Sequence, residues 1–88
     1  MIQNQKIEKR REGTKLSELR VGQKAKVILI DMINQKLKYH LLEMGLTRGT
    51  ILEVRRIAPM GDPVCLFFRG YELSVRKKDL EKIIVEVL

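Results

Sequence analysis

Apolar and polar residues alternate along five short stretches of the chain, which is the pattern of β-strands with one buried face. The first stretch, Gln23 to Ile30, also carries Ile28 and Ile30 on the face opposite the one expected to be buried. The other stretches are residues 50–58, 64–68, 71–75 and 82–88. The side chains predicted to point into the core are Ala25, Val27, Leu29, Leu52, Val54, Val64, Leu66, Phe68, Tyr71, Leu73, Val75, Ile83, Val85 and Val87.

One segment changes to the spacing of a helix. Leu37, Leu41 and Met44 stand at positions i, i+4 and i+7, so they share one face of a helix. Asn34 is suited to cap its beginning, and Gly45 is suited to end it in the left-handed conformation. The sequence therefore predicts one helix, placed after the first strand.

Short turns connect these elements. Residues 14–19 predict a helical turn that lays Leu16 and Leu19 over the edge of the fold, and residues 77–81 predict a 3₁₀ turn that buries Leu80. Arg69-Gly70 predicts a tight hairpin turn, because glycine tolerates positive φ. The residues assigned to turns and caps are Gly45, Gly49, Gly61, Asp62, Pro63 and Gly70.

These elements predict a mainly β fold, a small antiparallel barrel of about five strands with one α-helix after the first strand. Closure into a barrel is favoured because it removes exposed strand edges that so short a chain has little else to cover. Residues 1–13 are polar and charged, and we expect them to form a mobile arm ahead of a single domain at residues 14–88.

The composition adds further expectations. Cys65 is the single cysteine, so no disulfide forms within the chain, and no apolar run approaches the roughly 20 residues of a membrane helix. We therefore expect a cytoplasmic protein that does not insert into a membrane. The 18 Lys and Arg residues against 11 Asp and Glu give a net charge of +7, which suits an acidic partner, a membrane face or a nucleic acid.

The sequence contains few residues that could catalyse a reaction or bind a metal ion. A nucleophile needs an activating base, and the one histidine, His40, lies on the predicted helix, far along the chain from Cys65. A closed transition-metal site needs about four ligands, which one cysteine and one histidine do not supply. The glycines of Gly45-Leu-Thr-Arg-Gly49 follow a helix instead of opening one, so they do not form a phosphate loop. We predict no enzyme activity, catalytic residue, metal site or cofactor.

Binding is the better supported class of function. Some apolar side chains lie on the outward rows of the strands, with arginines around them. If the strands place these side chains next to one another, they form a docking surface. The alternative is that they pack against the helix. The candidate partner-binding residues are Met60, Cys65, Phe67, Arg69 and Ile51. A basic barrel that binds nucleic acid is the less favoured alternative, because Phe67 is the only aromatic ring expected to be free for base stacking.

Two stretches together resemble a known family. They are LLEMGLTRGT and, one strand later, APMGDPVCLFFRGYELSVRKKD, and the likeness extends from about Leu16 to Ile84. Glycines 45, 49, 61 and 70 fall on the pattern of the FeoA family, ferrous iron transport protein A, together with Pro59, Asp62, Pro63 and Tyr71. The same domain also resembles the C-terminal domain of metal-dependent repressors. The short segment ahead of the barrel is expected to be too small for a DNA-binding domain, which favours the transport accessory over a stand-alone relative of the repressors.

The resemblance implies an SH3-like barrel and a small cytosolic accessory to FeoB, the membrane permease with a G-protein domain that imports ferrous iron. It implies that the barrel binds the cytoplasmic region of the permease and affects its assembly or gating. Apart from the resemblance, the sequence leaves a homo-oligomer open as a further option. Association with a transition-metal ion is implied by the family only, since the residues themselves offer no ligand set.

Overall fold

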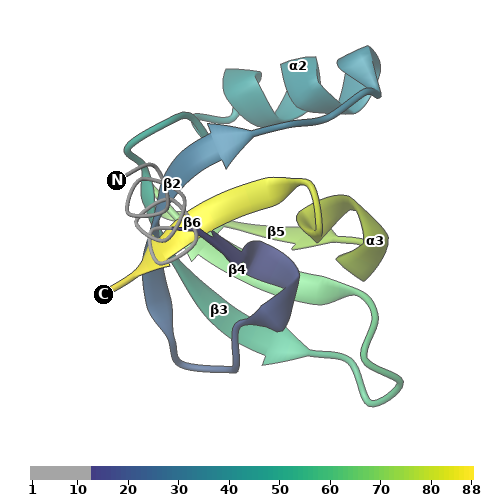
Figure 1. The fold of residues 1–88 in the computed structure, drawn as a ribbon. Helices are drawn as coiled ribbons and strands as arrows, with labels where there is room; N and C mark the ends of the chain where they lie inside the picture. Colours follow the sequence, from purple (N-terminus) through teal and green to yellow (C-terminus); the bar gives the residue numbers. More distant parts are fainter. Residues whose placement is uncertain (1–12) are drawn as a thin grey trace, which may run out of the picture.

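The computed structural model describes residues 13–88, so all of the expected N-terminal arm except Gly13 lies outside the described residues. Six strands form one antiparallel sheet, in the order β1-β6-β2-β3-β4-β5 (Figure 1). They are β1 (Thr14–Lys15), β2 (Lys24–Ile30), β3 (Ile51–Ile57), β4 (Val64–Phe68), β5 (Tyr71–Val75) and β6 (Ile83–Val87). The mainly β fold predicted from the alternating pattern is confirmed, but the predicted closure is incomplete, because β1 and β5 end the order and do not pair with each other. The additional strand is β1, whose two residues pair with β6.

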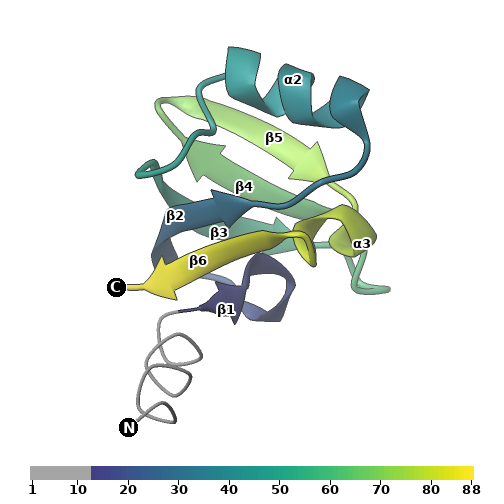
Figure 2. The same ribbon diagram turned by 45° about the horizontal axis from the view of Figure 1, so that its top comes forward.

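Three helical segments complete the fold. They are η1 (Leu16–Glu18), α2 (Gln35–Glu43) and α3 (Lys77–Leu80). The sheet curls around its core, and α2 lies beside β5 at the open side (Figure 2). The core is made almost entirely of aliphatic side chains, with Phe68 as its one aromatic ring, and it also holds Met32 and Leu46, which the sequence patterns did not place inward.

The helix α2 begins and ends as predicted. The side chain of Asn34 accepts a hydrogen bond from the Leu37 N–H at 3.1 Å, which satisfies one of the free donors at the start of the helix. Leu41 is fully buried, and Leu37 and Met44 pack against the core. Gly45 follows with φ of 97°, a left-handed conformation in which glycine is strongly preferred.

Three side chains predicted to be buried are exposed instead: Leu29 by 52%, Tyr71 by 59% and Val87 by 41%. A β-bulge shifts the pairing of β2 with β6 between Val27 and Leu29, so the alternation reverses from that point. Leu29 therefore faces solvent, whereas Ile30 packs against the core. Tyr71 is the first residue of β5, and Val87 is the last residue of β6.

The β4–β5 hairpin has a turn in which both central residues are left-handed, with φ of 52° at Arg69 and 83° at Gly70. Such turns match the twist of the two strands they join. Gly49 and Gly61 also have positive φ, and the Asp62–Pro63 peptide bond is cis. The carboxylate of Asp62 accepts a hydrogen bond from the N–H of Lys77 at 2.8 Å, which ties the β3–β4 loop to the start of α3.

Candidate protein-interaction surface

The outer face of β3, β4 and β5 carries the side chains that the core does not use. In the strand register, Glu53 lies opposite Phe67, and Phe67 lies opposite Glu72. The pairing of β3 with β4 shifts between Val54 and Arg56, so Arg55 is the extra residue of a bulge. The bulge brings two consecutive arginines toward one row of acidic side chains.

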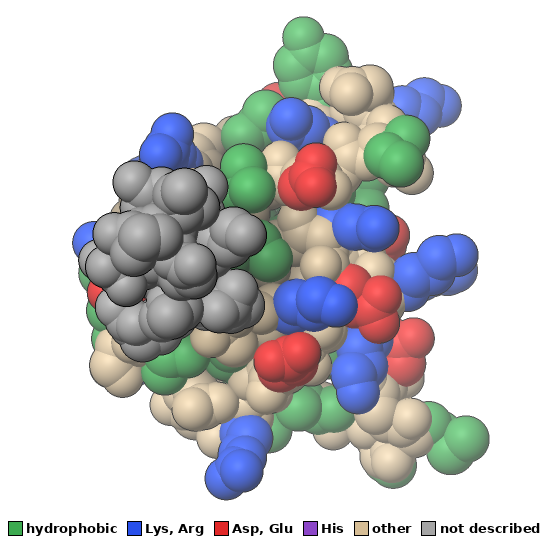
Figure 3. Space-filling view, viewed as in Figure 1, with side chains coloured by type: hydrophobic (Ala, Val, Ile, Leu, Met, Phe, Trp, Pro, Cys, Tyr) green, Lys and Arg blue, Asp and Glu red, His purple; other side chains and the backbone are tan. Residues whose placement is uncertain are grey.

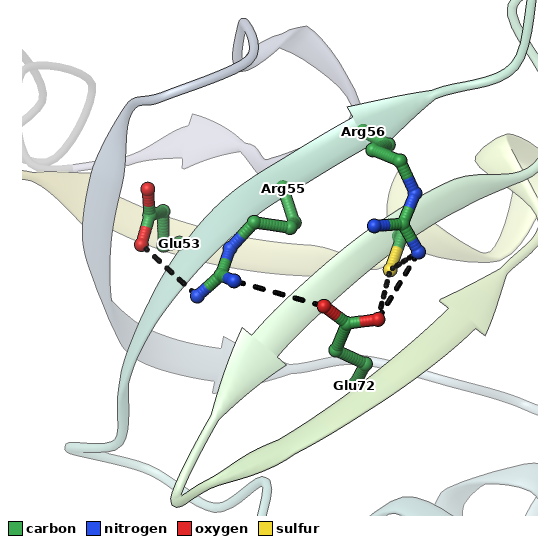
Figure 4. Close-up of polar contacts among 5 residues, drawn as sticks. Glu53, Arg55, Arg56 and Glu72 are labelled. Carbon is green, nitrogen blue, oxygen red and sulfur yellow. Dashed lines mark hydrogen bonds and ion pairs between the residues drawn. The ribbon is translucent and has the colours of Figure 1, made fainter.

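These charges form a chain of ion pairs across the three strands (Figure 4). Arg55 pairs with Glu53 and with Glu72, each at 3.6 Å, and Arg56 pairs with the other oxygen of Glu72 at 3.1 Å. Such exposed pairs contribute at most about 1 kcal/mol each to stability. Their main effect is to fix where the two guanidinium groups lie.

Phe67 lies beneath this chain of charges. The guanidinium carbon of Arg55 is 4.0 Å from the centre of the Phe67 ring, which is a cation–π contact. The ring is half-buried and is covered by the arginine on that side. Phe67 is thus part of the outer face as predicted, but it is not a bare aromatic platform.

Cys65 was expected to be exposed, and the structure shows this to be wrong. The Cys65 side chain faces the outer side of β4, opposite Arg56, yet only 6% of the residue is exposed. Its thiol lies 3.4 Å from Nη2 of Arg56 and 3.8 Å from a carboxylate oxygen of Glu72. The pKa of the Arg56 guanidinium is raised above its ordinary value, first by the hydrogen bond to Glu72 and then by the Coulomb attraction of Cys65 and Glu72. A partner on this face would touch Arg56 and Glu72 before it touched Cys65.

Arg69 has a role within the fold that the sequence did not reveal. Its Nε donates a hydrogen bond to the backbone carbonyl of Gly45 at 3.0 Å, and the hydroxyl of Thr50 donates to the same oxygen at 2.9 Å. A Cβ at Gly45 would lie 2.6 Å from Cδ of Arg69. The hairpin turn is therefore fastened to the end of α2, across 24 positions of the sequence.

A shallow groove of about 190 Å³ opens beside this face. Its walls include Ile51, which is 54% exposed, and Phe67 and Arg69. Lys24 and Glu53 also line it, so charged groups surround an apolar floor. Of the five predicted partner-binding residues, the structure brings Ile51, Phe67 and Arg69 together. Met60 is 92% exposed in the β3–β4 loop and does not line the groove.

Residues 13–88 show few features of metal binding, membrane insertion or nucleic-acid binding. No group of three or more His, Cys, Asp or Glu residues in this part of the chain is placed to hold a metal ion. None of its helices is long and apolar enough to cross a membrane. On the face shown in Figure 3, Lys and Arg side chains alternate with Asp and Glu and do not merge into one basic area. Tyr39, on α2, and Tyr71, at the start of β5, are the exposed aromatic residues of the described part.

Comparison with known proteins gives a consistent result. The family description "FeoA domain" matches residues 14–87. A fusion protein of Fe(2+) transport protein A and the Fe(2+) transporter FeoB from Porphyromonas gingivalis is 34% identical over 74 residues, which is 84% of this chain and 9% of the fusion protein. The FeoA-like protein of Clostridium acetobutylicum is 43% identical with a TM-score of 0.77, covering 88% of each chain. The FeoA protein of Chlorobium tepidum is 37% identical with a TM-score of 0.80, covering 85% of this chain and 70% of that one.

More distant structures share the fold alone. FeoA of Stenotrophomonas maltophilia, described as a prokaryotic SH3 domain protein, is 21% identical with a TM-score of 0.72, covering 83% of this chain and 89% of that one. The repressor IdeR of T. acidophilum is 17% identical with a TM-score of 0.76, covering 86% of this chain and 34% of that one. The SH3-like fold and the likeness to a repressor domain are therefore both confirmed.

Proposed function

The chain belongs to the FeoA domain family, and from this membership we propose that it is a cytoplasmic accessory protein of ferrous iron transport that binds a FeoB-type permease. The observation that carries the proposal is the Porphyromonas gingivalis relative, which joins Fe(2+) transport protein A to the transporter FeoB in one chain. Fusion keeps two parts at a high effective concentration, which benefits parts that act together. The separate chain would reach the same arrangement by binding.

The docking surface in this proposal is the groove lined by Ile51, Phe67 and Arg69. An exposed β-branched side chain beside a partly covered aromatic ring gives a partner an apolar anchor point, and Lys24 and Arg69 at the rim favour acidic neighbours. Binding there would affect the assembly or gating of the permease through contact alone. Residues 13–88 hold no ligand set for a metal ion, so no step is assigned to bound metal, and ferrous iron enters only as the cargo of the permease.

Nucleic-acid binding is the weaker alternative. Proteins that bind single strands stack bases on open aromatic rings along a basic groove. Here Arg55 already lies over the Phe67 ring, and the two exposed tyrosines belong to different elements, Tyr39 to α2 and Tyr71 to β5. These features favour a protein partner.

Co-purification with the permease of the same organism tests the proposal. Wild-type chain should retain the detergent-solubilised permease, and Ile51→Ala should bind it roughly tenfold more weakly, because the exposed anchor is truncated. Tyr39→Ala is the matched control, since it also truncates an exposed apolar residue but on α2. Ferrous iron uptake in a deletion strain should be restored by the Tyr39→Ala chain and poorly by the Ile51→Ala chain. Absence of binding by the wild-type chain, with uptake unchanged by the deletion, would refute the proposed function.

A further inference from the structure

The strand β5 lies at the edge of the sheet. It pairs with β4 on one side only, and no other strand of the described chain follows it in the sheet order. An edge strand presents backbone N–H and C=O groups that are free to pair with another chain. The fold thus leaves one side of β5 without a strand partner.

The hairpin turn determines which backbone groups point to that open side. In a hairpin closed by a two-residue turn, the flanking residues Phe68 and Tyr71 form a hydrogen-bonded pair, and such pairs recur at every second position. Leu73 therefore also exchanges hydrogen bonds with β4. The N–H and C=O groups of Glu72 and Ser74 point away from β4, and no turn, loop or cap within residues 13–88 gives them a backbone partner.

A groove of about 250 Å³ runs beside this open edge. Leu37, His40 and Leu41 of α2 form one wall, and β5 forms the other with Leu73, Ser74 and Val75. Figure 2 shows α2 lying next to β5 along this side of the molecule. A helix beside a free strand edge is an arrangement that accepts an extended peptide, since the edge supplies hydrogen bonds and the helix supplies side-chain contacts.

The charges around the groove indicate the composition of such a peptide. Arg76 and Asp79 lie at its end, and Arg76 takes part in none of the ion pairs found within residues 13–88. Those residues carry 14 Lys and Arg against 9 Asp and Glu, a net charge of +5. An acidic segment is therefore attracted to the domain as a whole, and its apolar side chains would pack against Leu37 and Leu73, the half-buried leucines of the groove.

We propose that an extended segment of the partner, with alternating apolar and acidic residues, pairs with β5 as an added strand in the groove between β5 and α2. The identity of that partner as the FeoB-type permease rests on the proposed function. The site is separate from the Ile51 groove, so one permease can contact the chain at two places. Each contact would increase the apparent affinity of the other.

Proline substitution at the strand edge gives a direct test. Ser74→Pro removes the N–H that points outward and places a ring at the open edge, while the pairing of β5 with β4 does not need that N–H. Ser74→Ala removes the hydroxyl but keeps the N–H, so it is the matched control. Short overlapping peptides that cover the cytoplasmic segments of the permease are the probe, and their affinity is measured by fluorescence anisotropy.

We expect at least one peptide to bind wild-type and Ser74→Ala chains equally, and Ser74→Pro at least about tenfold more weakly, because one backbone hydrogen bond is lost and the edge is blocked. In the wild-type chain the same peptide should slow hydrogen exchange at the amides of Glu72 and Ser74, a measurement that needs no variant. Equal binding by Ser74→Pro, unchanged exchange at these amides, or a wild-type chain whose β5 edge is already occupied by a second copy would overturn the inference.

The outcomes for the proposed function remain distinct. If no peptide binds but the intact permease is retained and Ile51→Ala weakens its retention, the strand-addition site is wrong and the proposed function stands. If neither peptides nor permease bind, both fail.

Discussion

Replacement of Gly45 by alanine tests whether Arg69 fastens the hairpin to the helix. Two effects add at this position. An L-residue with φ of 97° is strained, which costs about 1–2 kcal/mol in the left-handed region. The new Cβ would also lie 2.6 Å from Cδ of Arg69, so the arginine must move and give up its hydrogen bond to the Gly45 carbonyl.

That hydrogen bond contributes about 0.5–1.5 kcal/mol, so Gly45→Ala should destabilise the domain by about 1.5–3.5 kcal/mol in total. Gly49→Ala provides the control for strain alone, because its φ is 92° and a Cβ there meets nothing within 4 Å. It should cost about 1–2 kcal/mol. The difference of about 1 kcal/mol corresponds to a further loss of roughly 4–8 °C in Tm for a domain of this size.

Urea unfolding, followed by circular dichroism, measures the free energy of unfolding of both variants. The Arg69→Ala background completes a double-mutant cycle. In an Arg69→Ala background the clash and the hydrogen bond are both absent, so Gly45→Ala should cost no more than Gly49→Ala does. Equal costs for the two glycine variants in the wild-type background would refute the reasoning, because they would show that Arg69 gives way freely and does not fasten the turn.

Three further outcomes follow from the fold. Asn34→Ala should lower the free energy of unfolding by about 1 kcal/mol, measured by urea unfolding, because the helix loses its cap; an unchanged value would argue against the capping bond. Leu29→Ala should change the free energy of unfolding by less than about 0.5 kcal/mol because Leu29 is exposed, whereas Leu52→Ala should lower it by about 2–5 kcal/mol because Leu52 is buried. Comparable losses in the two variants would mean that the bulge in β2 is misplaced. The Cys65 thiol should react slowly with a thiol reagent in the native chain and faster in Arg56→Ala, and equal rates in the two chains would show that Arg56 does not cover the thiol.

Alternation along the strands predicted most of the fold because the side chains of a strand repeat every two residues. The pattern correctly placed Leu52, Val54, Leu66 and Phe68 in the core, and the same reasoning at helical spacing placed Leu41 there. The pattern fails where the repeat itself is interrupted. The bulge in β2 depends on how that strand meets β6 across the sheet, and no local feature of the sequence marks it.

The candidate surface was harder to predict for a related reason. Strand alternation identified which residues face outward, but it does not reveal what lies over them. The bulge in β3 brings Arg55 onto Phe67 and Arg56 onto Cys65, and Glu72 joins them from a third strand. These contacts need the register of three strands at once. The two consecutive arginines, Arg55 and Arg56, which interrupt the alternation of apolar and polar residues, are the only clue the sequence carries.

Binding of the isotope-labelled chain to the purified cytoplasmic region of the FeoB-type permease, mapped residue by residue by NMR, tests the central claim most directly. The account predicts saturable shifts that cluster at Ile51, Phe67 and Arg69, with a second group along β5 if the added strand forms. The affinity should fall in Ile51→Ala and stay unchanged in Tyr39→Ala. Spectra unaffected by the permease region, or shifts confined to surfaces away from both grooves, would contradict it.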